Sequence, residues 1–168
     1  MVMEFVYRQT LEKRLNDLLA PQRHDLRLRI VSLHILDPII RDQSFLDKLE
    51  KLSRRQAKVA IVADRRQTQK DPIKLKIKDD IENIGKIRFH LRQNIHAKIV
   101  HMESHNEYGV LVSSANISDH ALHTYREGGI FLLNEQKEIH EKIGEYISHI
   151  LGNDRVGDAD FESNDEED

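Results

Sequence analysis

A short apolar run, AKVAIVA at positions 57–63, restricts the fold of this chain more than any other segment. A run of this length, rich in alanine, valine and isoleucine, predicts a strand buried inside a sheet. Such a strand needs amphipathic helices to cover it, and the flanking segments supply two. Ser44 can cap a helix over 45–55, and Pro72 can begin another helix whose isoleucines recur at helical spacing.

The remaining periodic segments predict an α/β fold with a mixed β-sheet flanked by helices. Alternating apolar residues predict strands, and apolar stripes predict helices. A hairpin turn and the loops between elements are indicated by polar residues, glycine and proline. The expected strands are 26–35, 86–91, 94–102, 109–114 and 127–133, and the further expected helices are 4–19 and 135–151. We also expect a polar loop at 64–71, a hairpin turn at 104–109 and a short helical turn at 116–123.

The composition excludes several classes of protein. The chain has 168 residues, of which 33% are charged and 39% hydrophobic, as expected of one soluble domain. It contains no apolar run of about 18 residues that would predict a transmembrane helix, and the early charges argue against a secretory signal. Cysteine is absent, which excludes disulfides and zinc–thiolate sites. We therefore expect a cytoplasmic protein.

The net charge of −3 is unevenly distributed along the chain. Residues 153–168 contain eight acidic side chains and one basic side chain, so this segment carries −7 and residues 1–152 carry +4. We interpret 1–152 as one folded domain and 153–168 as an acidic, disordered tail. A mildly basic domain can meet a phosphate polyanion. The tail is either a solubilising end or a mimic of nucleic acid that shields a binding site.

The pattern His-x-Lys occurs twice, at His96 and Lys98 and again at His140 and Lys142. Neither copy is informative alone, because ten histidines make one chance occurrence ordinary. The first copy falls in a predicted strand, where residues i and i+2 share a face. The second falls in a predicted helix, where residues i and i+2 point in divergent directions. Only His96 and Lys98 can therefore converge on one ligand.

Further polar residues follow the first copy. Ser113, Ser114 and Asn116 end the next predicted strand, and the hairpin pairing returns them to the His96 end. Glu127 then opens the following strand. This pattern resembles the HKD signature of the phospholipase D superfamily, which is His-x-Lys, an aspartate, Gly-Ser-x-Asn and a later acidic residue. The resemblance is close over residues 96–127 and loose over the preceding elements, and it implies a phospholipase D-like catalytic domain over 1–152.

The sequence departs from this signature at three points. Glu103 stands where the superfamily usually has aspartate, a position whose role there is mainly structural. The gap from Glu103 to Ser113 is longer than usual, and we place the extra residues in the hairpin turn. Ser113 replaces the usual glycine, so its side chain could limit how closely the backbone approaches a phosphate.

The resemblance assigns a chemical role to each residue of the motif. Cleaving an anionic phosphodiester requires positive charge, a nucleophile and a proton donor for the leaving oxygen. By resemblance, His96 attacks phosphorus and forms a phosphohistidine, while Lys98 and Asn116 hold the non-bridging oxygens. Ser114 adds a hydrogen bond to these oxygens. Glu127 accepts a hydrogen bond from the far imidazole nitrogen of His96 and fixes its tautomer.

Three more residues are candidates for binding the substrate. Ser113 adjoins the motif, whereas Arg65 and Arg66 lie in the predicted loop after a buried strand, where such sheets usually place ligands. A solvated loop explains the two arginines equally well. The resemblance requires neither a metal ion nor an organic cofactor.

The resemblance implies a metal-independent phosphodiesterase, and because short members of the superfamily with one motif are mostly nucleases, it favours a nuclease. Lipid enzymes of the superfamily usually carry two motifs in a longer chain. One alternative is a phospholipase D-type lipid phosphodiesterase. The other is a non-catalytic nucleic-acid-binding module, which Ser113 and the longer turn keep open.

The number of histidines predicts the assembly. The mechanism needs one histidine to attack and a second to donate a proton, but the complete motif occurs once. We therefore expect a homodimer in which two His96 side chains flank one phosphate, with the turn 104–109 and the segment around Asn116 at or near the interface. Nucleic acid is the expected partner, and the sequence leaves open whether the chain joins a larger defence or repair complex.

Overall fold

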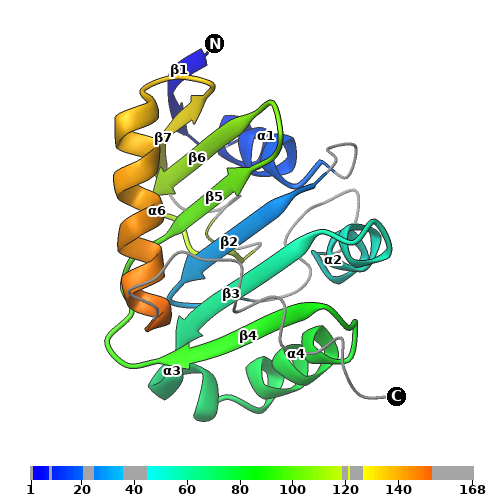
Figure 1. Ribbon diagram of the computed structural model, residues 1–168. Coiled ribbons are helices and arrows are strands. Elements are labelled where there is room, and N and C mark those ends of the chain that lie inside the picture. The colour runs from blue at the N-terminus through cyan, green and yellow to red at the C-terminus, as the bar shows by residue number, and fades with distance from the viewer. Residues whose placement is uncertain are drawn as a thin grey trace.

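The apolar runs of the sequence come together in one sheet. The computed structural model describes residues 2–7, 9–20, 25–35, 45–118, 121 and 127–152, and within them the sheet has seven strands in the order β1-β7-β6-β5-β2-β3-β4 (Figure 1). The strands are β1 (Val2–Tyr7), β2 (Arg27–Ser32), β3 (Lys58–Asp64), β4 (Ile87–Arg92), β5 (Ile99–Glu103), β6 (Tyr108–Ser113) and β7 (Gly128–Leu133). The helices are α1 (Gln9–Leu18), α2 (Phe45–Arg54), α3 (Arg65–Gln69), α4 (Pro72–Glu82) and α6 (Lys137–Leu151).

The sheet is mixed, as the sequence predicts. Strands β2, β3 and β4 run parallel, and helices α2 and α4 lie in the connections between them. Strands β5, β6, β7 and β1 pair antiparallel, and β5 also pairs antiparallel with β2. Strand β5 therefore joins the parallel half to the antiparallel half, and its N-terminal end lies beside the C-terminal ends of β2 and β6.

Helices cover both faces of the sheet (Figure 1). Along β2, Ile30 faces a core that contains residues of α1, α2 and α4, whereas its neighbour Val31 faces α6. Strand β3 repeats this alternation with Ile61 and Val62. The run 57–63 is thus buried on two sides, which explains why it is apolar at nearly every position.

A buried polar layer lies between the sheet and α6. His101 of β5 stacks on His140 of α6 with ring centroids 4.1 Å apart. Burial lowers the pKa of His101 to about 3 and also lowers the pKa of His140, so both rings are neutral at pH 7. Arg29 of β2, also buried, pairs with Glu103 at 3.4 Å. A Cβ at Gly144 would lie 3.2 Å from His101 Nε2, so this glycine lets α6 pack closely on the layer.

The N-terminal prediction is partly wrong. The expected helix 4–19 is a strand followed by a helix, because residues 2–7 pair with β7 and the helix begins only at Gln9. Along β1, Phe5 and Tyr7 are exposed and Val6 between them is buried, which is the period-two pattern of a strand. The apolar stripe of the later residues, including Leu11 and Leu15, is helical as expected.

Two further expectations need correction. The loop predicted over 64–71 contains the short helix α3, because the side chain of Asp64 accepts a hydrogen bond from Gln67 N and caps it. The strand predicted over 94–102 begins only at Ile99, so His96 and Lys98 lie in an irregular segment before it. The tail 153–168 and half of the turn expected at 116–123 lie outside the described residues.

The close packing of β6 on β7 generates a stability prediction. A Cβ at Gly129 would collide with the carbonyl oxygen of Val112 and would lie 3.0 Å from Ser113 Cα. We expect Gly129→Ala to destabilise the fold by about 1–3 kcal/mol, the usual cost of overpacking. Chemical denaturation measures this free energy of unfolding. The matched control is Gly128→Ala, whose Cβ would meet only Val6 O at an ordinary 3.4 Å, and equal losses in the two variants would contradict the explanation.

Candidate active site

The residues of the motif gather at one edge of the sheet because of strand direction. His96 and Lys98 precede β5, Ser113 ends β6 and Glu127 precedes β7. The pairings β5–β6 and β6–β7 are antiparallel, so the start of one strand lies beside the end of the next. The parallel strands β2 and β3 also end at this edge, because β2 runs antiparallel to β5.

Lys98 contacts both His96, before β5, and Ser113, at the end of β6. Its Nζ donates to the carbonyl oxygen of His96 at 2.8 Å and lies 3.3 Å from His96 Nδ1. Its own carbonyl oxygen accepts from Ser113 N at 3.0 Å, which extends the β5–β6 pairing one step beyond the regular strands. The two side chains are therefore in contact, but a hydrogen-bonded loop and not the predicted strand holds them.

Asn116 lines the same small cleft as Lys98 and Ser113. Asn116 Oδ1 is buried and has no hydrogen-bond partner, which is uncommon for a buried amide. The Ser113 hydroxyl donates to Ala115 O at 3.1 Å, so it stabilises the turn after β6. Lys98, Ser113 and Asn116 thus line one small cleft between the sheet and α1.

Ser114 and Glu127 form a second contact at this edge. The Ser114 hydroxyl donates to the Glu127 carboxylate and accepts from Gly128 N at 3.1 Å, and Ser114 N donates to Gly128 O at 2.9 Å. Glu127 therefore contacts a serine of the motif, whereas the sequence resemblance assigns it to the imidazole of His96. The contact uses one of the two carboxylate oxygens.

Asp64 positions the His96 segment, a role that the sequence analysis missed. This side chain is 5% exposed. One of its oxygens caps α3 and the other accepts from Ile95 N at 3.1 Å. A single carboxylate thus ties the end of β3 to the residue before His96. The signal in the sequence was an acidic residue directly after the buried run 57–63.

His34 is a second residue of this edge that the sequence analysis missed. Burial lowers its pKa, and the positive charges of Lys74 and Lys98 lower it further. Its Nδ1 is buried and has no hydrogen-bond partner. The Ser32 hydroxyl donates to His34 O at 2.6 Å and accepts from Ile117 N at 3.1 Å, which ties the end of β2 to the segment that follows Asn116.

The remaining candidates lie apart from this cluster or have other contacts. Arg65 and Arg66 are exposed on α3 at the same edge of the sheet, and Arg65 donates to Leu91 O at 3.4 Å. His140 of the second His-x-Lys pattern is 3% exposed on the inner face of α6, whereas Lys142 is exposed and pairs with Glu138 at 2.9 Å. The second pattern therefore does not form a converging pair.

The fold and this cluster define a phospholipase D-like domain. Residues 27–151 match the family described as cardiolipin synthase, PLD-like domain, and the chain belongs to this family. No curated protein matches the sequence. None of the described helices is long and apolar enough to cross a membrane.

Solved structures share the fold at low sequence identity. Nuc, a phospholipase D family member from Salmonella typhimurium, is 18% identical with a TM-score of 0.70, over 92% of this chain and 96% of Nuc. NucT from Helicobacter pylori is 16% identical with a TM-score of 0.66, over 90% and 96% of the two chains. The yeast tyrosyl-DNA phosphodiesterase is 14% identical with a TM-score of 0.50, over 79% of this chain and 32% of the yeast protein.

The contact between Asp64 and the His96 segment generates a prediction about local stability. We expect Asp64→Ala to increase hydrogen exchange at the Ile95 amide, because the acceptor of that amide is removed. Exchange measured by NMR or mass spectrometry over residues 93–98 tests this. Asp71→Ala is the control, since Asp71 caps α4 through Ile73 N in the same way. Unchanged protection of Ile95 in Asp64→Ala would contradict the assignment.

Proposed function

We propose that this chain is a metal-independent phosphodiesterase, and specifically a nuclease, that acts through a phosphohistidine in a site shared by two chains. The observation that carries the proposal is the convergence of Lys98 with His96, Ser113 and Asn116 at one edge of the sheet. These groups offer a nucleophile and hydrogen-bond donors for phosphate oxygens. The chain's membership of a phospholipase D-like family supports the same chemistry.

The proposed reaction has two steps at phosphorus. His96 attacks the phosphodiester, the bond from phosphorus to the leaving oxygen breaks, and a second histidine donates a proton to that oxygen. Water activated by the second histidine then attacks the phosphohistidine and releases His96. Lys98 and Asn116 stabilise the charge on the non-bridging oxygens in both steps. Ser114 adds a hydroxyl, while Glu127 stabilises the imidazole of His96 in its charged form.

The contact between Lys98 and His96 describes the site before substrate binds. An ammonium group can only donate, so Lys98 at 3.3 Å makes Nδ1 of His96 an acceptor and places the ring proton on Nε2. A nucleophilic Nε2 needs the opposite tautomer. A bound phosphate would attract Lys98 away from Nδ1, which frees Nδ1 to carry the proton and to donate to Glu127. Substrate binding and activation of the nucleophile are thereby coupled.

Two observations favour nucleic acid over lipid as the substrate. Residues 1–152 carry +4, so the polyanion is attracted to the domain that holds the site. The fold is shared with the yeast tyrosyl-DNA phosphodiesterase, whose name describes a phosphodiesterase that acts on DNA. Arg65, Arg66 and Ser113, at the same edge, are the residues we propose to contact the nucleic acid backbone.

The dimer follows from the number of usable histidines and from an exposed apolar row. His140 is buried on the inner face of α6 and cannot serve as the second histidine of this site. Phe5 of β1, Ile130 of β7 and Val112 of β6 are in register across three strands, and all are exposed. Val112, at one end of this apolar row, is adjacent to Ser113 in the sequence. Two copies that pair through the row would therefore bring their candidate active sites close together.

The structure separates the two segments that the sequence analysis assigned to the interface. The turn from Ser104 to Glu107 lies at the opposite end of β5 and β6 from the His96 segment. The segment around Asn116 lies at the same end. An interface at which two His96 side chains flank one phosphate therefore includes the Asn116 segment and not the turn.

The first test of this function is cleavage in the absence of metal. Purified protein in EDTA should cleave single-stranded DNA, duplex DNA or RNA, and should leave phosphatidylcholine intact. His96→Ala should abolish turnover, and Lys98→Ala should lower it roughly 10²-fold, the scale of one lost transition-state donor. Lys142→Ala is the matched control and should retain activity. Cleavage that requires Mg²⁺, or cleavage of the lipid alone, would overturn the proposal.

The second test concerns the shared site. Wild type mixed with an equal amount of His96→Asn, after full subunit exchange, should contain about one quarter wild-type dimers by random pairing. Mixed dimers hold one His96 each and should be inactive, so activity per dimer should fall to about a quarter of the wild-type value. A fall to one half would show that each chain works alone, and His34 would then become the candidate for the second histidine.

A surface variant separates the interface from the chemistry. Phe5 is 74% exposed on β1, whereas Ile73 is 65% exposed on α4. Phe5→Asp should weaken the dimer in analytical ultracentrifugation and lower activity in parallel, while Ile73→Asp should do neither. Activity that persists in monomeric Phe5→Asp would contradict the shared site.

A further inference from the structure

One face of the parallel half of the sheet is basic. Helix α6 packs mainly on β5 and β6 (Figure 1). On the same side of the sheet, the residues that alternate with the buried core positions of β2, β3 and β4 are Arg27, Lys58 and Arg88. Lys86 directly precedes β4 and is exposed at the same end. We call these four residues the basic face.

We propose that the acidic C-terminal segment 153–168 binds the basic face of its own chain. The segment lies outside the described residues, and its sequence carries a net charge of −7. The four residues of the basic face are all cations, so the two parts of the chain attract each other. The proposal does not depend on the phosphodiesterase activity.

The end of α6 places the start of this segment beside the basic face. Arg92 of β4 donates to the carbonyl oxygens of Ile150 at 3.0 Å and of Leu151 at 2.6 Å. A cation at this position also suits the negative end of the helix. A Cβ at Gly152 would lie 3.9 Å from Arg92 Nη2, so the last described residue lies next to β4. The segment therefore begins beside the strand that carries Arg88.

The distance from the end of α6 to the basic face is short for a segment of this length. Arg88 precedes Arg92 on β4 by about 13 Å, given about 3.3 Å per residue. About four extended residues cover that distance, so Asp158 and the later acids can reach the basic face. Asp158, Asp160 and Glu162 recur at every second position, and an extended segment would present all three on one side.

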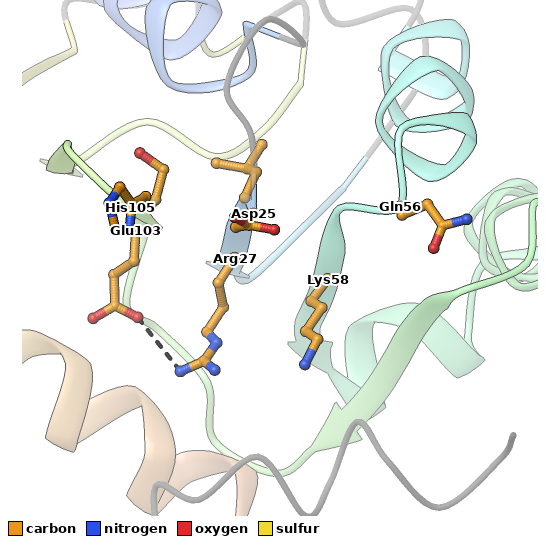
Figure 2. A pocket seen from close by; sticks show the side chains of 8 residues that line it. Asp25, Arg27, Gln56, Lys58, Glu103 and His105 are labelled. Atoms are coloured by element: carbon orange, nitrogen blue, oxygen red, sulfur yellow. Dashed lines mark ion pairs between the residues drawn. The ribbon is translucent and has the colours of Figure 1, made fainter.

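A pocket at this end of the sheet can receive a carboxylate. Its volume is about 470 Å³, and its lining includes Arg27 and Lys58, which Figure 2 shows on neighbouring strands. The carboxylates of Asp25 and Glu103 also line it, and Glu103 lies 3.9 Å from Arg27. A guanidinium group has five N–H donors, so Arg27 can bind a further carboxylate while it pairs with Glu103.

Tethering makes these weak ion pairs effective. A single exposed ion pair contributes little, because water and salt screen it. A segment joined to the folded domain by a short linker, however, has an effective concentration in about the millimolar range. The contact is therefore favoured at low ionic strength and lost at high ionic strength. A nucleic acid that approaches the basic face must displace the segment, so the contact would weaken binding at that face.

Crosslinking of the full-length chain tests where the acidic segment binds. A carbodiimide joins a lysine amine to an adjacent carboxylate without a spacer, and mass spectrometry identifies the joined peptides. At low salt, Lys58 and Lys86 should be joined to acids of 153–168. The yield should fall roughly 10-fold at about 1 M salt, where the Debye length is about 3 Å. The control is Lys51, exposed on α2 at the opposite face of the sheet, which should give few such links.

Two further arms identify the occupant of the basic face. In an equal mixture of unlabelled and nitrogen-15-labelled chains, links within one chain keep a single label, whereas links of mixed label would place the segment on a second copy and overturn the proposal. Lys86→Glu should lower the yield of links at Lys58 several-fold, while Lys51→Glu should not. Equal links at Lys51 and Lys86 would contradict the proposal. Absence of links at low salt would leave the face to nucleic acid and overturn it as well.

Discussion

The antiparallel pairing of β5 with both β2 and β6 is the constraint on which the rest of this structure depends. It places the start of β5 beside the ends of β2 and β6, and the bond from Ser113 N to Lys98 O extends that pairing into the loop. A shift of one residue in this register would exchange the two faces of β5. Both Lys98 and the buried His101 would then face the wrong layer, so the register determines the candidate active site and the polar layer together.

The sequence predicted the elements that have a clear apolar period. It also predicted which residues the β5–β6 hairpin brings close together. The buried strand β3, the helices α2 and α6 and the β5–β6 hairpin lie where their apolar patterns placed them. The convergence of Lys98 with Ser113 and Asn116 followed from one inference, that antiparallel neighbours bring the start of one strand to the end of the next. Such arguments are local and survive errors of a few residues at element boundaries.

The failures have a common physical cause, since each depended on contacts between distant residues. The segment 2–7 is a strand because β7 offers an open edge to pair with, and short apolar stretches fit either period when the partner is unknown. Asp64 and His34 could not be assigned from the sequence either. Asp64 reaches Ile95, far along the chain, and His34 acquires its altered pKa only when folding buries it near Lys74 and Lys98.

His96 and His101 show that environment, and not residue type, determines what a histidine can do here. They lie five positions apart, yet His96 is exposed in a loop beside an ammonium group, whereas His101 is fully buried against a second imidazole and near a guanidinium group. His96 is open to solvent, and Lys98 Nζ lies 3.3 Å from its Nδ1. Burial lowers the pKa of His101 and holds its ring neutral between the sheet and α6. Within five positions, the same residue type is thus an exposed side chain beside an ammonium group and a neutral ring packed in the buried layer.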